Sequence, residues 1–504
     1  MFNINTDDIS QSYEEFRERV KRGASFAVTG LTSVLRLFLL TKIKFYSKKK
    51  VLFVTSTEQN ALKYQSDLLS AFNVKSEVLP FQNISMYEGV SPNLYDYAQQ
   101  IKILNSHPDV VICPVKSLLE KFPDKDFFKK NGLKIKIGDS IDLKDLARKL
   151  INLGYKKSTM VNDVSEFSIR GDIADVFSLD DNPVRIELWG DEVVDIRYFD
   201  NETQKSVEKI KEVTIFPVYK FITVGQEELV KSLQQNDEDE IPEENYFSGI
   251  EVYQNYFNKN LVSVLDYFED YVLVFDETSE IYSKYEFVND NLDKQLEEGV
   301  RLGLLKQLDG NNHLTYEEFL RKTSYFIKVG FNNFIDGAMG DLVEFNSQPL
   351  RNFEADIDLI TDFILEHKAY KLIIATDYPE RVKEILSEKN IFTPEYTDST
   401  VLGGCILEDF KTVIMTDREL FNKRSKEVTA SKKSYFKEKP EYIENINDIK
   451  PGEFVVHTIH GLGIYKGLSK QEIDGQLKDY LTIEYANKDR LHIPAEQINL
   501  LCRY

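Results

Sequence analysis

The chain has 504 residues, 42% of them hydrophobic, and a formal net charge of −21 at pH 7. This length is enough for several domains with their own buried cores, and it excludes a small scaffold held together by disulfides. Because a strongly acidic chain is repelled by phosphate backbones, nucleic acid is a poor candidate for the main partner of this chain by itself.

The cysteines and the first residues indicate the compartment. Cys113, Cys405 and Cys502 lie far apart in the sequence, which favours a reducing environment. The N-terminal residues are polar and acidic, and no apolar run reaches about 18 residues, so neither a secretion signal nor a membrane-spanning helix is expected. We therefore expect a cytoplasmic protein with no membrane partner.

Residues 1–130 have the pattern of an α/β domain. Short apolar strands are predicted over 25–29, 51–55 and 110–113, each followed by a helical pattern. The first of these helices is expected to end at residue 40, and the last is expected over 115–121. Strands that alternate with helices favour a parallel sheet with crossover helices. We assign this segment to the first part of a nucleotide-binding-type domain.

Residues 131–217 change to a two-residue alternation, with strands predicted over 166–178, 183–189 and 192–199. This predicts an inserted α+β domain whose antiparallel sheet has one solvent-exposed face. On that face the alternation places three arginines and the single tryptophan of the chain: Arg170, Arg185, Arg197 and Trp189. Both residue types are enriched at interface hot spots. The alternative is a solvated face on which a neighbouring loop covers the tryptophan.

Residues 218–344 return to mixed helix and strand, and we assign them to the second part of the first domain. They contain an acidic run over 237–244, which predicts a solvated loop. An apolar strand over 272–275 ends in Asp276 and Glu277.

Residues 345–422 form a small third α/β domain. A helix is expected over 353–367, a strand over 371–376 and a second helix over 379–389.

A basic stretch follows, and we assign residues 423–446 to a linker. The remaining residues, 447–504, have glycine-punctuated strand patterns that predict a small β-barrel.

Two segments resemble the parts of a nucleotide site. A strand, Gly30, a short loop containing Ser33 and then a helix have the shape of a phosphate-binding loop, but the second glycine and the Lys-Ser/Thr pair are absent. Asp276 and Glu277 stand where a magnesium-binding strand would end. We interpret Gly30, Ser33, Asp276 and Glu277 as a degenerate, non-functional site in one domain that the inserted segment divides.

No catalytic or metal-binding set stands out. His457 and His460 have metal-ligand spacing and Cys502 is an imaginable third ligand, but a zinc site needs more ligands at clean spacing. The imidazoles beside Gly461 and Gly463 are expected to bond to turns instead. We predict no catalytic residues and no metal.

The strand containing Tyr480, Leu481, Thr482 and Ile483 has two readings. It is either an edge strand that accepts a partner strand, or an ordinary internal strand of the barrel. The pattern alone leaves both open.

The quoted residues resemble a known family. The C-terminal run from Lys450-Pro451-Gly452 through His460-Gly461-Leu462-Gly463 to Tyr504 is similar to the polymerase-interacting domain of bacterial transcription-repair coupling factors. Glu166 to Asp172, Val184 to Glu187 and Gly190 to Val193 resemble the UvrB-homology module of that family, and Gly403 to Phe421 its third domain.

The resemblance implies a RecA/UvrB-like first domain without nucleotide and an SH3/Tudor-like C-terminal barrel. It also implies two partners, UvrA and the β subunit of RNA polymerase. Arg170 and Arg185 match the UvrA-contacting arginines of the family, and Trp189 replaces its aromatic contact residue, a phenylalanine. The segment Tyr480 to Ile483 matches the polymerase-binding segment, with Leu481 as the foremost single contact.

The family continues beyond this match into a translocase motor that holds the ATP, magnesium and double-stranded DNA sites. The resemblance therefore implies that this chain is not an enzyme and needs no cofactor, and that its N-terminal module is held against the motor of the full protein. We expect an adaptor between stalled polymerase and UvrA in transcription-coupled nucleotide excision repair. The alternatives are a UvrB-like nucleotide-dependent helicase and a stand-alone polymerase-binding transcription regulator.

Overall fold

The computed structural model divides into two compact units, residues 1–430 and 431–504. It describes residues 2–4, 10–82, 94–179, 182–201, 203–233, 246–247, 249–303, 305–306, 313–334, 340–398, 402–422, 450, 452–457, 461–473, 476–484, 490–494 and 501–503. Within these ranges no helix is long and apolar enough to cross a membrane.

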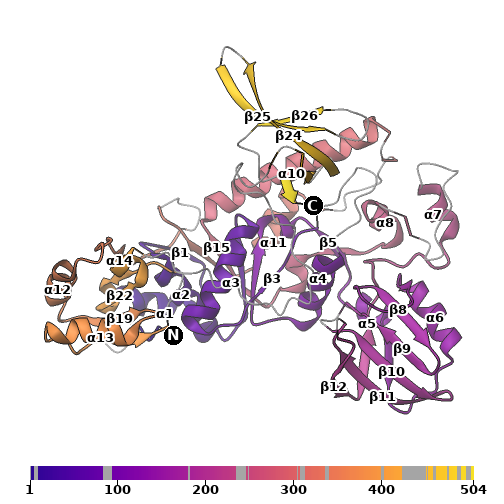
Figure 1. Cartoon of the computed structure of the whole chain (residues 1–504), viewed down its shortest axis with the longest axis horizontal. Helices are drawn as coiled ribbons and strands as arrows, with labels where there is room; N and C mark the ends of the chain where they lie inside the picture. Colours follow the sequence, from indigo (N-terminus) through magenta and orange to yellow (C-terminus); the bar gives the residue numbers. More distant parts are fainter. Residues whose placement is uncertain are drawn as a thin grey trace. The chain divides into compact units, whose positions relative to one another are not determined.

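A seven-stranded, all-parallel sheet forms the centre of the first unit (Figure 1). Its strands, in spatial order, are β17 (Leu342–Glu344), β1 (Phe26–Thr29), β16 (Lys328–Phe331), β15 (Val272–Asp276), β2 (Val51–Thr55), β4 (Val110–Pro114) and β3 (Glu77–Val78). Strands from before and after the predicted insertion therefore pair directly in one sheet.

Both faces of this sheet are buried under helices. Alternate strand residues point to opposite faces, so Phe53 joins the core under the first three helices, whereas Leu52 and Val54 join the second core. The first face carries α1 (Gln11–Arg22), α2 (Ser33–Ser47) and α3 (Glu58–Phe72). The second carries α4 (Leu94–Ser106), α9 (Val264–Tyr267), α10 (Thr278–Arg301) and α11 (Tyr316–Thr323).

The inserted segment forms a separate sheet with helix α6 (Leu143–Asn152) beside it (Figure 1). Its strand order is β12 (Ser206–Ile210), β11 (Glu192–Phe199), β10 (Val184–Trp189), β9 (Ile173–Val176), β8 (Glu166–Arg170) and β7 (Lys156–Lys157). Leu146 and Leu150 of α6 pack against Phe167, Val184 and Ile186, which closes one face of the sheet. The opposite face is partly covered, because Phe177 and Phe199 join a separate core with α4 and α5 (Phe127–Asn131), and it is exposed towards Arg170 and Trp189.

Short elements complete the first unit around the insertion. Two small ladders join β5 (Lys121–Pro123) to β14 (Leu261–Ser263) and β6 (Leu133–Lys136) to β13 (Glu212–Ile215). The short helices are α5 (Phe127–Asn131), α7 (Glu227–Leu233) and α8 (Gln254–Phe257), and 3₁₀ turns lie at Val115–Leu118 and Ile250–Tyr253.

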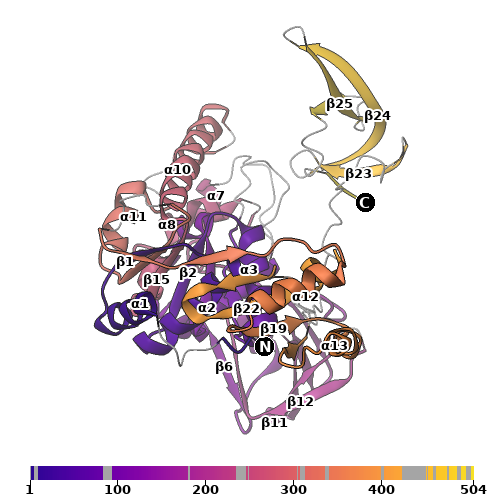
Figure 2. The same ribbon diagram turned by 90° about the vertical axis from the view of Figure 1, so that its left-hand side faces the viewer.

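Residues 345–422 build a five-stranded sheet that shares a core with the parallel sheet domain (Figure 2). Ile373, Phe410 and Ile414 join the core that contains α1 and α2, and the ring of Phe410 lies 5.1 Å from that of Tyr13. The strands are β18 (Ser347–Pro349), β21 (Cys405–Leu407), β22 (Thr412–Thr416), β19 (Lys371–Ala375) and β20 (Glu395–Thr397). Helices α12 (Ile357–Glu366), α13 (Pro379–Glu388) and α14 (Asp417–Phe421) contribute to a second core on its other face.

The second unit contains an antiparallel sheet of five strands. Their order is β26 (Arg490–Pro494), β25 (Gln476–Glu484), β24 (Gly461–Ile473), β23 (Phe454–His457) and β27 (Leu501–Arg503). Val455, Tyr465, Leu481 and Ile483 are buried, which gives the sheet one apolar side.

The structure confirms the alternation of helix and strand but corrects three local predictions. The helix expected over 115–121 is a 3₁₀ turn followed by β5, because Lys121–Pro123 pairs with β14. The strand expected over 166–178 is the hairpin β8–β9, which turns at Gly171 with φ of 60°. The helix after β1 runs to Ser47, well beyond its predicted end at residue 40.

Three predicted features lie outside the described residues: the acidic run over 237–244, the linker over 423–446 and His460. Nothing here tests them.

Candidate protein-binding sites

The loop after β1 is occupied by the chain itself. Gly30 has φ of 74°, and a Cβ there would lie 1.8 Å from the carbonyl oxygen of Phe345. The hydroxyl of Ser347 accepts the backbone N–H of Thr32 at 2.8 Å and donates to the carbonyl oxygen of Gly30 at 2.7 Å. An amide at the start of α2, the position that binds phosphate in nucleotide sites, is therefore already bound to a side chain. Ser33 is the first residue of that helix.

A buried arginine pairs with Asp276 and Glu277, the two acidic residues of the predicted degenerate site. Arg36 of α2 forms ion pairs with Asp276 and, at 2.7 Å, with Glu277, and donates to Asn333 Oδ1 at 3.1 Å. The side chains of Arg36 and Asp276 are only 7% and 6% exposed. Burial lowers the pKa of Arg36, but the two carboxylates more than offset it and the net pKa is raised. Positions that would coordinate magnesium in a nucleotide site thus hold an internal cation.

The exposed face of the inserted sheet is organised around one buried carboxylate. Asp175 of β9, 1% exposed, accepts from Arg185 Nε at 2.7 Å and Nη2 at 2.9 Å, and from Arg170 Nη2 at 2.8 Å. Arg185 also donates to the carbonyl and side-chain oxygens of Gln204 and covers the ring of Phe199 at 4.5 Å. Its side chain is 14% exposed, whereas that of Arg170 is 50% exposed.

The sequence pattern placed both arginines on this face but did not single out Asp175. The available signal was an acidic residue between Ala174 and Val176 in a short strand, which is unusual in a buried position.

A second charged network lies beside the first. Arg197 of β11 pairs with Glu187 and Asp195, and Lys209 of β12 pairs with Asp195 at 2.9 Å. The pKa of Glu187 is lowered by its bond to Arg197, and that of Asp195 by its bonds to Lys209 and Arg197. The side chain of Arg197 is only 15% exposed. Its main effect is therefore to hold neighbouring side chains of this face in place.

Trp189 is the most exposed anchor on this face. It ends β10 on the same side as Arg185 and Glu187, and it is 81% exposed. The alternative in which a neighbouring loop covers it is therefore wrong. A tryptophan in water beside ordered arginines has the composition of an interface hot spot.

Residues 480–483, which the resemblance assigns to polymerase binding, lie in an interior strand. β25 pairs with β24 on one side and with β26 on the other, and residues 480–483 are bonded across both ladders. Of the two readings that the sequence left open, the internal strand is therefore the correct one, because both rows of main-chain groups are already paired. Leu481 and Ile483 are fully buried and Thr482 is 8% exposed, whereas Tyr480 is partly exposed.

Within the described residues, no group of His, Cys, Asp and Glu is arranged to hold a metal ion. The cysteines described there, Cys113 and Cys405, are buried and free. Burial raises the pKa of both thiols, so neither is an activated nucleophile.

Two family models match the two proposed interfaces. Residues 133–221 match the UvrB interaction domain, and residues 449–504 match the CarD-like/TRCF RID domain. The first match covers the inserted sheet with its arginines and tryptophan, and the second covers the C-terminal sheet.

Curated relatives match almost the whole chain. A transcription-repair-coupling factor from Staphylococcus aureus is 24% identical over 95% of this chain and 45% of its own length. One from Staphylococcus epidermidis is 25% identical over the same shares. The chain thus spans about 45% of the length of these relatives, and its resemblance to the N-terminal part of transcription-repair-coupling factors is confirmed.

We expect Arg36→Met to destabilise the first unit by about 3–5 kcal/mol, because it leaves buried carboxylates without their charge partner. The matched control is Arg148→Ala, which removes an exposed ion pair to Asp145 and is expected to cost less than about 0.5 kcal/mol. Urea unfolding followed by circular dichroism measures both. Equal stability of the two variants would contradict a structural role for Arg36.

The two arginines on Asp175 should differ in their effect on folding. Arg185→Ala removes four hydrogen bonds, two of them to a buried carboxylate, and is expected to cost about 2 kcal/mol or more. Arg170→Ala leaves the bidentate pair in place and should cost less than about 1 kcal/mol. Thermal unfolding of the two variants tests this order, and the reverse order would refute the network described here.

Proposed function

We propose that this chain is the adaptor part of a transcription-repair coupling factor. It binds RNA polymerase through its C-terminal unit and UvrA through the exposed face of the inserted sheet, and so starts transcription-coupled nucleotide excision repair. The observation that carries the proposal is the pairing of two interaction-domain matches with an exposed, charge-ordered face that ends in Trp189. In this proposal the chain acts in the cytoplasm by binding its partners, and it catalyses no reaction.

On the UvrA side, Trp189 and Arg170 make the direct contacts. Arg170 keeps half of its side chain exposed and most of its donors available, and a guanidinium pairs well with carboxylates in planar geometry. Arg185 and Arg197 act mainly by holding the face in one arrangement, since their donors are largely used within the sheet. An ordered face loses less side-chain entropy when a partner binds.

On the polymerase side, the partner is the β subunit. Residues 480–483 contribute through the partly exposed Tyr480, while Leu481, Thr482 and Ile483 support the sheet from inside. Any added partner strand would join an outer strand of the sheet, β26 or β27.

The nucleotide site does not function in this proposal, and the chain carries no enzymatic activity or cofactor of its own. Support comes from Arg36 in the place of the metal and Ser347 on the loop amide. In the full protein, ATP, magnesium and double-stranded DNA belong to a C-terminal motor, which also holds the N-terminal module until polymerase engages. The first domain is then a degenerate RecA/UvrB-like fold and the C-terminal unit an SH3/Tudor-like barrel.

We expect Trp189→Ala to weaken binding to UvrA at least tenfold and to leave binding to the β subunit unchanged, because the Trp189 side chain is 81% exposed and offers a large apolar area to a partner. Pull-down or interferometry with UvrA and with the isolated β-subunit region measures both. The matched control is Tyr325→Ala, an equally exposed aromatic outside the inserted sheet. Unchanged UvrA affinity in Trp189→Ala would remove this face from the interface.

The second unit offers a test that separates binding from folding. Tyr480→Ala should weaken binding to the β subunit and keep the near-ultraviolet signal of the folded sheet. Leu481→Arg should unfold the second unit, since it buries an unpaired charge in a site that is fully excluded from solvent. If Leu481→Arg stays folded and loses only β binding, the residue contacts the partner directly.

A nucleotide-dependent, UvrB-like helicase is the alternative function from another class. A ligand present at one hundred times its Kd raises stability by about 2.7 kcal/mol. We expect millimolar ATP with magnesium to leave the melting temperature of the chain unchanged. A rise of several degrees would favour the helicase, whereas β binding without UvrA binding would favour a stand-alone transcription regulator.

A further inference from the structure

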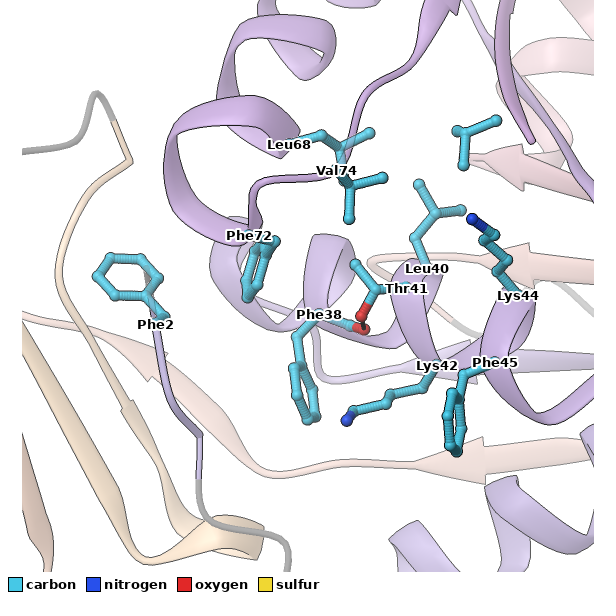
Figure 3. A pocket seen from close by; sticks show the side chains of 11 residues that line it. Phe2, Phe38, Leu40, Thr41, Lys42, Lys44, Phe45, Leu68, Phe72 and Val74 are labelled. Atoms are coloured by element: carbon cyan, nitrogen blue, oxygen red, sulfur yellow. Dashed lines mark hydrogen bonds between the residues drawn. The ribbon is translucent and has the colours of Figure 1, made fainter. Parts of the chain in front are cut away.

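A cavity of ≈ 380 Å³ opens on the helical layer of the first unit (Figure 3). We call it the α2–α3 pocket, since its walls come mainly from helices α2 and α3 and from the segment that follows α3. The apolar wall consists of Phe38, Leu40, Leu68, Phe72 and Val74. Leu40 and Leu68 are fully or almost fully buried, so the floor of the pocket is dry and apolar.

One cation in this pocket has no carboxylate partner among the described residues. The ammonium group of Lys42 lies 4.9 Å from the ring centre of Phe38 and 5.9 Å from that of Phe45. Lys44, two residues further along the same helix, pairs instead with Asp109 at 2.6 Å. Burial lowers the pKa of Lys42, as expected for an ammonium group that is partly desolvated and lacks a counter-charge.

The rim of the pocket is apolar and exposed. Phe45, which lines the pocket, is 71% exposed. Large apolar side chains that stand in water around a concave site are typical of interaction surfaces. A ligand that only fills the cavity would leave the Phe45 ring exposed to water, whereas a ligand that extends beyond it would cover the ring.

We propose that the α2–α3 pocket binds a segment of a partner protein in which an aromatic or large aliphatic side chain lies next to an aspartate or glutamate. The apolar side chain enters the cavity, whose volume is near the lower end for ligand sites and suits one large side chain. The neighbouring carboxylate pairs with the ammonium of Lys42. The flanking peptide covers Phe45, which distinguishes this occupant from a small molecule.

The charge of the chain makes this site specific. At a net charge of −21 the molecule repels acidic partners as a whole, so an acidic segment binds only where a cation is locally unpaired and shielded from solvent. Lys42 is partly desolvated and has no carboxylate partner among the residues that the structure describes, so a carboxylate beside it would add a charge pair that is not seen there.

The test uses the whole chain and two blocked peptides, Gly-Asp-Phe-Asp-Gly and its neutral counterpart with asparagine in place of each aspartate. Saturation-transfer NMR titration gives the dissociation constants. We expect the acidic peptide to bind at least tenfold more tightly than the neutral one. In Lys42→Met this ratio should fall to within about twofold of one, and in Phe45→Ala both peptides should bind more weakly. Tyr325→Ala, the exposed aromatic control, should match the parent chain.

Several outcomes would overturn the proposal. These are equal binding of the two peptides by the parent chain, a tenfold ratio that persists in a folded Lys42→Met variant, or no binding of either peptide at millimolar concentration. If free 3-phenylpropionate binds as tightly as the acidic peptide, the occupant is a small carboxylate and not a protein segment. If sedimentation detects a dimer that Phe45→Ala dissolves, the occupant is a second copy of this chain.

Discussion

Arg36 and Asp276 lie 240 residues apart in the sequence, and their buried ion pair is the constraint on which the first unit depends. Removing two charges from water is favourable only when each is paired and hydrogen-bonded, so neither residue can remain inside the molecule without the other. The pair fixes the first turns of α2 to the end of β15. It therefore connects the strands that precede the insertion to those that follow it. A segment of about the length of a domain can then leave the sheet and return without opening the core.

The same contacts hold together the loop, the helix and the strand that resemble parts of a nucleotide site. In a working site, bound phosphate and metal would hold the loop, the helix and the acidic strand together. Here Ser347 bonds to the loop backbone and Arg36 pairs with the carboxylates. Ser347 comes from residues 345–422, whose sheet shares a core with α1 and α2. That segment therefore supplies part of the stabilisation that a ligand would supply, which gives it a structural role in the first unit.

The exposed face of the inserted sheet illustrates a different use of charge. Asp175 is almost completely buried and orients two guanidinium groups, one nearly enclosed and one half exposed. Trp189 stands beside them in water. The arrangement separates the residues that hold the face from those left free for a partner. Replacement of Arg185 is therefore expected to disturb the packing of the sheet, whereas replacement of Trp189 changes the surface alone.

Local pattern was sufficient for several conclusions. The two-residue alternation of Val184–Trp189 placed Trp189 and Arg185 on the outer face, because strand geometry fixes the direction of successive side chains. The missing glycine and lysine of the phosphate loop were likewise visible without a structure. Both properties depend on residues only a few positions apart in the sequence. At that distance the backbone geometry and the residue types determine them without knowledge of the tertiary structure.

Tertiary structure decided the rest, because it depends on which distant segments meet. Tyr480 to Ile483 has the same alternation in an edge strand and in an interior one, and only pairing with both β24 and β26 shows that it is interior. Residues 121–123 form a strand and not the end of a helix because β14, far away in the sequence, pairs with them. Asp175 became the centre of its face through partners on β8 and β10, and Arg36 found its carboxylates at the end of β15. The sequence by itself determined which strand residues could face solvent and which loop lacks the residues of a phosphate site. The tertiary structure decided which of these residues bond to other parts of the chain and which stay exposed.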